Sequence, residues 1–245
     1  MNLFSLEELL KNVRIIGSPA QQHQPTSANP HEGLFELMAF ANASNWDKGG
    51  STRQSIDQIT KNIVHVYSSG ALGLQVTPEY VITAKHALHR GQKHYVENQA
   101  GQKYKVKGIW ASKYQDIAIA RIERSSEYQG PARIHLGKPN RKGTKVILHY
   151  QEKDAAITQL QGEITNTRHD TRTAKDIYHS QFMVDIPTKP GYSGSPVCNT
   201  YGELLGFVST GCNSLPPSSC SDIQEAVRII NTMAGEAFYG RNARP

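Results

Sequence analysis

Residues 189–197 read KPGYSGSPV, and this stretch decides how the rest of the chain is interpreted. Gly191 and Gly194 flank Ser193, and glycine is the residue that a backbone needs where it adopts positive φ or approaches a ligand closely. The pattern predicts a tight turn that exposes the Ser193 hydroxyl, with the amides of Gly191 and Ser193 directed at one point. A serine hydroxyl alone is a poor nucleophile, so a reactive Ser193 requires a base, usually histidine, and a carboxylate that orients the base.

The order of these groups along the chain separates unrelated hydrolase designs. Ser193 follows all ten histidines, of which His179 is the last. The nucleophile elbow of α/β-hydrolases needs the order serine, acid, histidine, and it needs glycine where this chain has Ser195, so both requirements fail. The subtilisin order is weakly supported, because no acidic residue on a clear strand precedes the best histidine. The order histidine, aspartate, serine is left.

Two apolar strands supply the base and the acid. Residues 80–88 read YVITAKHAL, a β-branched run that predicts a buried strand with His86 at its end. Residues 114–122 read YQDIAIARI, so Asp116 immediately precedes another apolar strand, where a carboxylate can be partly buried as an orienting aspartate must be. Asp185 is the rival acid. It lies on the strand that leads into the serine turn, and we expect a structural or substrate-contacting role for it.

Three motifs in this order resemble one known family, the chymotrypsin-like serine proteases. They are TAKH at 83–86, DIA at 116–118 and GYSGSP at 191–196. The resemblance is closest to the compact bacterial branch that includes glutamyl endopeptidases and the protease domains of HtrA proteins. It covers roughly residues 60–235, judged by motif order and strand pattern. It implies an all-β fold of two antiparallel six-stranded barrels.

The resemblance also implies an activity and a role for each site residue. His86, Asp116 and Ser193 would form the catalytic triad of an endopeptidase that acts through an acyl-enzyme. The amides of Gly191 and Ser193 would form the oxyanion hole. The substrate is then a polypeptide, and neither an organic cofactor nor a metal is needed. The alternative is a catalytically silent module that binds extended peptides or partner proteins.

Strand and helix patterns divide the chain into three parts. Residues 1–60 form an N-terminal extension with a short helix and a linker. Alternating apolar residues from Asn62 predict a first barrel over 61–135, and short strands predict a second barrel over 136–240. Residues 222–237 show helical spacing after Ser221, a candidate cap, and predict a closing helix.

The extension offers fewer signals than the barrels. Leu6, Leu9, Leu10 and Val13 fall at helical spacing, which predicts a short amphipathic helix, and residues 18–29 are typical of a linker. The apolar patch at 34–40 is too short to assign as helix or strand; packing outside the barrel is favoured over a plug or partner-binding element. Glu7 and Glu8 interrupt any secretory signal. We therefore expect a cytoplasmic protein, or one exported or injected without a Sec signal.

The expected preference for the substrate side chain beside the scissile bond follows from the family resemblance alone. The pocket for the residue beside the scissile bond would be walled by Pro187, Thr188 and Lys189 on one side, and by Val208, Ser209, Thr210 and Gly211 on the other. None of these is a carboxylate, and Val208 stands where glutamate-specific members use histidine. We expect a small or apolar preference, and we expect residues 209–211 to pair with an extended substrate backbone.

Tyr192 departs from the family pattern. In activatable animal members the residue before the serine is an aspartate that pairs with a newly cut N-terminus. A phenol, neutral at ordinary pH, cannot make that ion pair. We therefore expect that proteolytic activation through a new N-terminus is not required.

Charge and cysteines suggest few further partners. The net charge is +6 and the pI about 9.2, but basic residues are scattered apart from Lys138–Lys145, which lacks interleaved aromatic residues, so we expect no nucleic-acid binding. No apolar run is long enough to span a membrane. The three cysteines, Cys198, Cys212 and Cys220, do not form a zinc pattern. Cys212 and Cys220 could close a loop, although reduced thiols are the default without a secretory signal.

Overall fold

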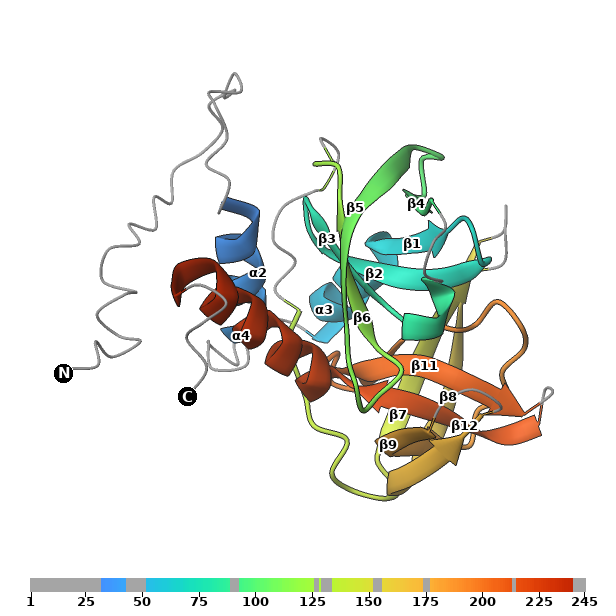
Figure 1. Ribbon diagram of the computed structural model, residues 1–245. Coiled ribbons are helices and arrows are strands. Elements are labelled where there is room, and N and C mark those ends of the chain that lie inside the picture. Colours follow the sequence, from blue (N-terminus) through green and yellow to red (C-terminus); the bar gives the residue numbers. More distant parts are fainter. Residues whose placement is uncertain are drawn as a thin grey trace, which may run out of the picture. The chain divides into compact units, whose positions relative to one another are not determined.

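The computed structural model describes residues 32–42, 52–88, 93–125, 128, 134–151, 156–173, 177–212 and 215–239. The predicted helix near residues 5–13 and the predicted linker at 18–29 lie outside the described residues. Within residues 31–245, two closed antiparallel barrels of six strands each form one compact unit with helices beside them (Figure 1). The expected double-barrel fold is confirmed.

The first barrel has the strand order β1-β2-β3-β6-β5-β4. Its strands are β1 (Ile63–Val66), β2 (Ala71–Thr77), β3 (Tyr80–Thr83), β4 (Tyr95–Glu97), β5 (Lys103–Ala111) and β6 (Ala118–Ile122). Every residue of β2 and β3 is buried, including the polar Gln75 and Thr77. In β5, exposed lysines alternate with partly buried residues, so one face of the strand meets solvent and the other the core.

The second barrel has the order β10-β11-β12-β9-β8-β7. Its strands are β7 (Lys145–Gln151), β8 (Ile157–Arg172), β9 (Ile177–Val184), β10 (Pro196–Asn199), β11 (Leu204–Cys212) and β12 (Leu215–Asp222). Its core contains Phe182, Val184, Leu148 and Val197, among others. β8 is 16 residues long and continues past Ile164 into a hairpin with β9. Exposed polar residues dominate this outer half, so it has no apolar pattern to detect.

Helices cover one side of the barrels. α2 (Glu32–Asn42) and α4 (Ile223–Tyr239) lie side by side in Figure 1 and share a core with the first barrel, in which Leu37 and Ile230 are fully buried. The apolar stretch at 34–40 is therefore helical and packs on the barrel. The short helix α3 (Thr52–Lys61) leads into β1. Among the described residues, no helix combines the length and apolarity that crossing a bilayer requires.

The start of α4 differs from the prediction. Asp222, and not Ser221, caps the helix, since Oδ1 of Asp222 accepts a hydrogen bond from the amide of Gln224 at 2.9 Å. The Ser221 hydroxyl instead accepts a hydrogen bond from the Gln181 side chain. Both residues belong to β12, whose serines and prolines show no alternation and gave no strand signal.

Candidate active site

The register of the first barrel brings His86 and Asp116 to one edge. Thr83, the last residue of β3, pairs with Ala118, the first residue of β6. His86 follows Thr83 in the one-turn helix η2 (Lys85–Ala87), and Asp116 precedes Ala118 by two residues. Because antiparallel partners end and begin at the same edge of a sheet, the two side chains meet although 30 residues separate them.

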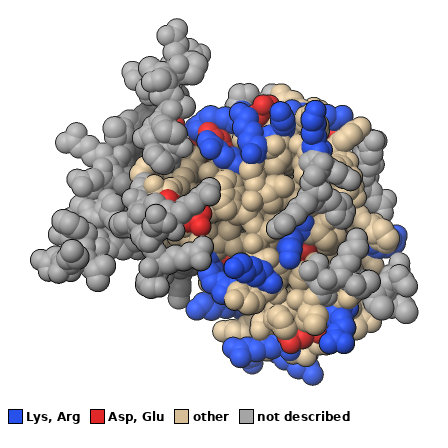
Figure 2. Space-filling model, in the orientation of Figure 1, with Lys and Arg blue, Asp and Glu red and all other residues tan. Residues whose placement is uncertain are grey.

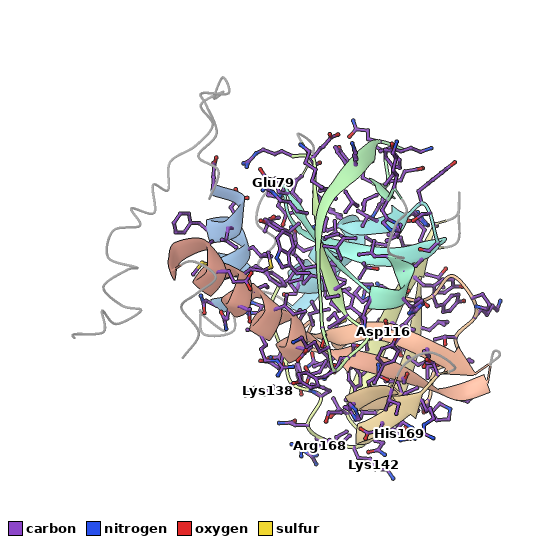
Figure 3. All side chains as sticks on the ribbon, viewed as in Figure 1. Glu79, Asp116, Lys138, Lys142, Arg168 and His169 are labelled. Carbon is purple, nitrogen blue, oxygen red and sulfur yellow. The ribbon has the colours of Figure 1, made fainter. Side chains whose placement is uncertain are left out.

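The Asp116 carboxylate is fully buried and accepts three hydrogen bonds. Oδ2 lies 2.6 Å from Nδ1 of His86 and accepts a bond from the Ser209 hydroxyl at 2.7 Å, and Oδ1 accepts one from the His86 amide at 2.9 Å. Asp116 lies where the first barrel meets the second (Figure 3), and Ser209 reaches it from β11. A buried charge is tolerated only with such partners. These bonds fix both the orientation of the imidazole and its tautomer.

Ser193 lies on the other side of the imidazole. Its Oγ is 2.9 Å from Nε2 of His86 and 3.3 Å from the carbonyl oxygen of Ser209. With the Nδ1 proton donated to Asp116, Nε2 of a neutral His86 is an acceptor, so the Ser193 hydroxyl donates to it. If His86 is protonated, Nε2 becomes a donor and the hydroxyl turns to the Ser209 carbonyl. The half-buried Ser193 therefore has a base within bonding reach only in the neutral form of His86.

Asp116 sets the charge of this histidine. Burial by itself would lower the pKa of His86, but the hydrogen bond to Asp116 and the negative charge of Asp116 outweigh burial and raise it above its ordinary value. Burial would raise the pKa of Asp116, but the hydrogen bond and charge of His86, with the bonds from Ser209 and the His86 amide, lower it. The pair thus favours an ionised Asp116 carboxylate beside an imidazole that is more basic than that of an ordinary histidine.

The Ser193 loop is fastened to both barrels. The Leu72 amide in β2 donates to the Ser193 carbonyl at 2.8 Å, and the Gly194 amide donates to the Val208 carbonyl in β11 at 2.8 Å. Gly194 has φ 79°, and a Cβ there would overlap the Leu72 carbonyl oxygen. Only glycine lets the loop approach β2 so closely.

The two amides expected to stabilise an oxyanion are free of backbone partners. Tyr192 and Ser195 donate their N–H groups within the loop, to the carbonyls of Lys189 and Tyr192 at 3.1 and 3.0 Å. Across the described residues, no backbone acceptor is bonded to the amide of Gly191 or of Ser193. Gly191 has φ 96°, a left-handed conformation that suits glycine. These donors are available to a ligand oxygen.

The residues expected to bind substrate lie near the serine loop or on β11. Val208 and Ser209 are buried, and Thr210 is half-buried. Buried Thr188 lies with its Oγ1 2.9 Å from Oγ of Ser218, which in turn donates to the Ile186 carbonyl. Gly211 belongs to β11, but its surroundings are outside the description.

The rival acid is not part of this arrangement. Asp185 is exposed, and its carboxylate accepts a hydrogen bond from the amide of Glu163 on β8. It holds the β8–β9 hairpin together. The expected structural role for Asp185 agrees with this contact.

Two cysteines are buried in strands of the second barrel. Cys220 is a free thiol, so it forms no disulfide bond with Cys212. Sγ of Cys198 lies 3.3 Å from Nε2 of His149, whose Nδ1 lies 3.2 Å from Oγ1 of Thr60 in α3. Local sequence patterns do not indicate the contact between His149 and Cys198, because 49 residues separate the two. Across the part of the chain that the structure describes, no group of three His, Cys, Asp or Glu side chains could hold a metal ion.

On the face that Figure 2 shows, lysine and arginine side chains are spread over several parts of the described surface. Lys138 and Lys142 are exposed at the end of the unit where Figure 3 also labels Arg168, whereas Lys145 pairs with Glu163 at 2.8 Å.

Comparisons with known proteins agree with the double-barrel fold. The family model for the trypsin-like peptidase domain matches residues 66–207. The structure resembles the MamO protease domain from Magnetospirillum magneticum in its apo form, with a TM-score of 0.60 and 17% identity over 70% of this chain and 96% of that chain.

A second solved protein shows the same fold. The Rv3671c protease of M. tuberculosis H37Rv, in its inactive form, gives a TM-score of 0.57 and 16% identity over 76% of this chain and 96% of that chain. A serine-to-alanine mutant of Rv3671c, also in an inactive form, gives 0.59 and 14% over 74% and 90%. A comparison with curated proteins finds no match.

Proposed function

The chain belongs to the trypsin-like peptidase family, and we propose that it is a serine endopeptidase with His86, Asp116 and Ser193 as its catalytic residues. The observation that carries the proposal is the continuous hydrogen-bonded chain from Asp116 through His86 to Ser193, with bonds of 2.6 and 2.9 Å. A module that only binds peptides has no need of a base, its orienter and a nucleophile in line.

Acylation follows from this geometry. Oγ of Ser193 attacks the peptide carbonyl carbon while its proton passes to Nε2 of His86. Asp116 stabilises the imidazolium that forms. The amides of Gly191 and Ser193 bind the oxyanion, and each such donor is worth about 10²–10³ in rate in a well-studied protease. His86 then gives the proton to the leaving nitrogen, and the C–N bond breaks.

Deacylation repeats these steps with water. His86 takes a proton from a water molecule that attacks the acyl carbon, and the oxyanion again binds at the two amides. When the intermediate collapses, the C–O bond to Ser193 breaks and His86 returns the proton to Oγ. The enzyme is regenerated and the second product is a free carboxylate.

The substrate is a polypeptide bound as an added strand along residues 209–211. Thr188, Val208, Ser209, Thr210 and Gly211 are proposed to contact it. The hydroxyls of Thr188 and Ser218 bond to one another, and no carboxylate lies among the residues expected to wall the pocket. Both features support a small or apolar side chain beside the scissile bond.

Labelling by a fluorophosphonate tests the proposal. The probe reacts with a serine only where a base and an oxyanion site activate it. We expect labelling of the full chain at Ser193, and loss of labelling in Ser193→Ala and His86→Ala. Ser195→Ala is the matched control, because the Ser195 hydroxyl is buried and without a hydrogen-bond partner, so this variant should label like the wild type.

Two results would contradict the proposal. The first is a folded wild type that does not react, which would favour a silent peptide-binding module. The second is labelling that persists in Ser193→Ala. Circular dichroism of each variant shows whether it is folded, so loss of labelling is not confused with loss of structure.

A further inference from the structure

Tyr192 lies between the two amides that the proposed oxyanion site uses. The Ser193 amide belongs to the planar peptide group that joins Tyr192 to Ser193, so the backbone at Tyr192 directs it. The Gly191 amide belongs to the preceding Pro190–Gly191 group, and Tyr192 is bonded to the residue that carries it. The Tyr192 side chain is only 5% exposed and belongs to the core of the second barrel. The serine loop is thus anchored from inside the barrel by the residue next to the nucleophile.

The anchor is an aromatic stack. The rings of Tyr192 and Tyr150 have centroids 4.1 Å apart and planes inclined by 25°. Stacked aromatic rings attract one another beyond the area that they bury. The loop itself supplies two further bonds at Tyr192, because its amide donates to Lys189 and its carbonyl accepts from Ser195.

Tyr150 is positioned by a paired strand. It lies near the end of β7, where it pairs with Thr158 of β8. Two residues earlier in β7, Leu148 pairs with Val197 of β10, the strand that begins directly after the serine loop. Tyr150 therefore stands on a strand that is paired with β8 at Tyr150 itself and with β10 two residues before it, close to the end of the loop.

We propose that Tyr150 is a positioning residue, which holds the Tyr192 ring and through it keeps the amides of Gly191 and Ser193 in the arrangement that binds an oxyanion. This inference rests on the proposed function and deepens it. The contact between Tyr150 and Tyr192 lies wholly within the second barrel. It does not involve an ion pair with a newly cut N-terminus. The loop is then set by packing as soon as the barrel folds.

The stack predicts a selective kinetic defect. Tyr150→Ala removes the ring beneath Tyr192, and the loop should lose order without a change at His86 or Asp116. We expect kcat for a peptide ester with a small apolar side chain, and the rate constant for fluorophosphonate labelling, to fall about tenfold or more. KM should stay within about twofold, because the lost interaction is made only with the developing oxyanion.

Two conservative variants separate stacking from packing volume. Tyr150→Phe keeps the ring and should restore both rates to near wild type. Tyr150→Leu keeps apolar volume without a ring, and should remain slow. Tyr201→Ala is the control, since Tyr201 is 73% exposed on the same barrel and its loss should change neither rate. The apparent pKa in the acid limb of the rate profile should be the same in all four variants.

Hydrogen exchange measures the loop without relying on activity. In Tyr150→Ala and Tyr150→Leu, the amides of Tyr192, Gly194 and Ser195 should exchange faster than in the wild type, and in Tyr150→Phe they should not. If the wild type does not react with the probe, the proposed function fails while this exchange result still tests the anchor. Wild-type protection and rates in Tyr150→Leu, or a Tyr150→Phe variant as impaired as Tyr150→Ala, would overturn the inference.

Discussion

Replacing Gly194 with alanine tests the contact between the serine loop and the first barrel. Gly194 has φ 79°, a conformation that costs an alanine about 1–2 kcal/mol. The new Cβ would overlap the Leu72 carbonyl oxygen and lie 2.6 Å from Oγ1 of Thr83. Neither neighbour yields easily, because the Thr83 hydroxyl donates to that same carbonyl at 2.5 Å. The loop must therefore move outward by about 1.5 Å to reach ordinary contact distance.

That movement breaks the bond across the two barrels. The Leu72 amide and the Ser193 carbonyl are 2.8 Å apart, and separating them leaves buried polar groups without partners, at a cost of about 1–3 kcal/mol. Adding the backbone strain, we expect Gly194→Ala to lower the free energy of unfolding by about 2–5 kcal/mol. Serine labelling should fall as well, because Ser193 moves with the loop.

Gly191→Ala is the matched control for this change. Gly191 also has positive φ, 96°, but a Cβ there would meet only the Gly70 carbonyl oxygen at 3.5 Å, an ordinary contact. It should cost only the backbone strain of about 1–2 kcal/mol. Urea unfolding followed by circular dichroism gives both values. Equal losses in the two variants, or a Gly194→Ala protein as stable as the wild type, would refute the reasoning.

Three further predictions concern titration and thiol reactivity. Asp116 raises the pKa of His86 against the effect of burial, and only neutral His86 accepts the serine proton. The value of kcat/KM should therefore fall with decreasing pH through an apparent pKa above the ordinary 6.5. A pH–rate profile with an apparent pKa below 6.5 would contradict this. Burial lowers the pKa of His149 to about 4, so below pH 6.5 the unfolded chain binds a proton that the folded chain does not, and stability falls with decreasing pH in that window. Between pH 7 and pH 5 this loss is about 2 kcal/mol by urea unfolding, and His149→Leu should lose that much less; an unchanged pH dependence in the variant would rule out His149 as the source. Burial raises the pKa of Cys198 to about 12 and that of Cys220 further still. Peptide-resolved mass spectrometry should therefore find neither thiol alkylated by iodoacetamide at pH 8 until the protein is unfolded. Modification of either thiol in the native protein would show that this cysteine is accessible and not buried.

Local sequence was sufficient where a site residue belongs to a strand end or a turn. His86 and Asp116 could be found because each stands beside a short apolar run rich in β-branched residues, a pattern that favours a buried strand. Ser193 could be found because glycines on both sides permit the turn that exposes it. The triad as a set and the double-barrel fold were predicted from the family resemblance of three short motifs in one order. Its catalytic role stays a prediction for the labelling experiment.

Long-range contacts decided the rest. Ser209 was expected to contact substrate, yet its hydroxyl bonds to Asp116, 93 residues away. The Tyr150–Tyr192 stack and the bond between Leu72 and Ser193 likewise join distant segments. Strand β12 gave no signal because its serines and prolines do not alternate, and it forms since β9 and β11 offer partners on both sides.

Local sequence alone indicated the candidate catalytic residues and the strands beside them, because backbone conformation and strand burial depend on neighbours a few positions away. Only the tertiary structure decided which side chains support them. Barrel closure and register determine which distant residues become neighbours, and a shift of one residue would turn each side chain of a strand to the opposite face.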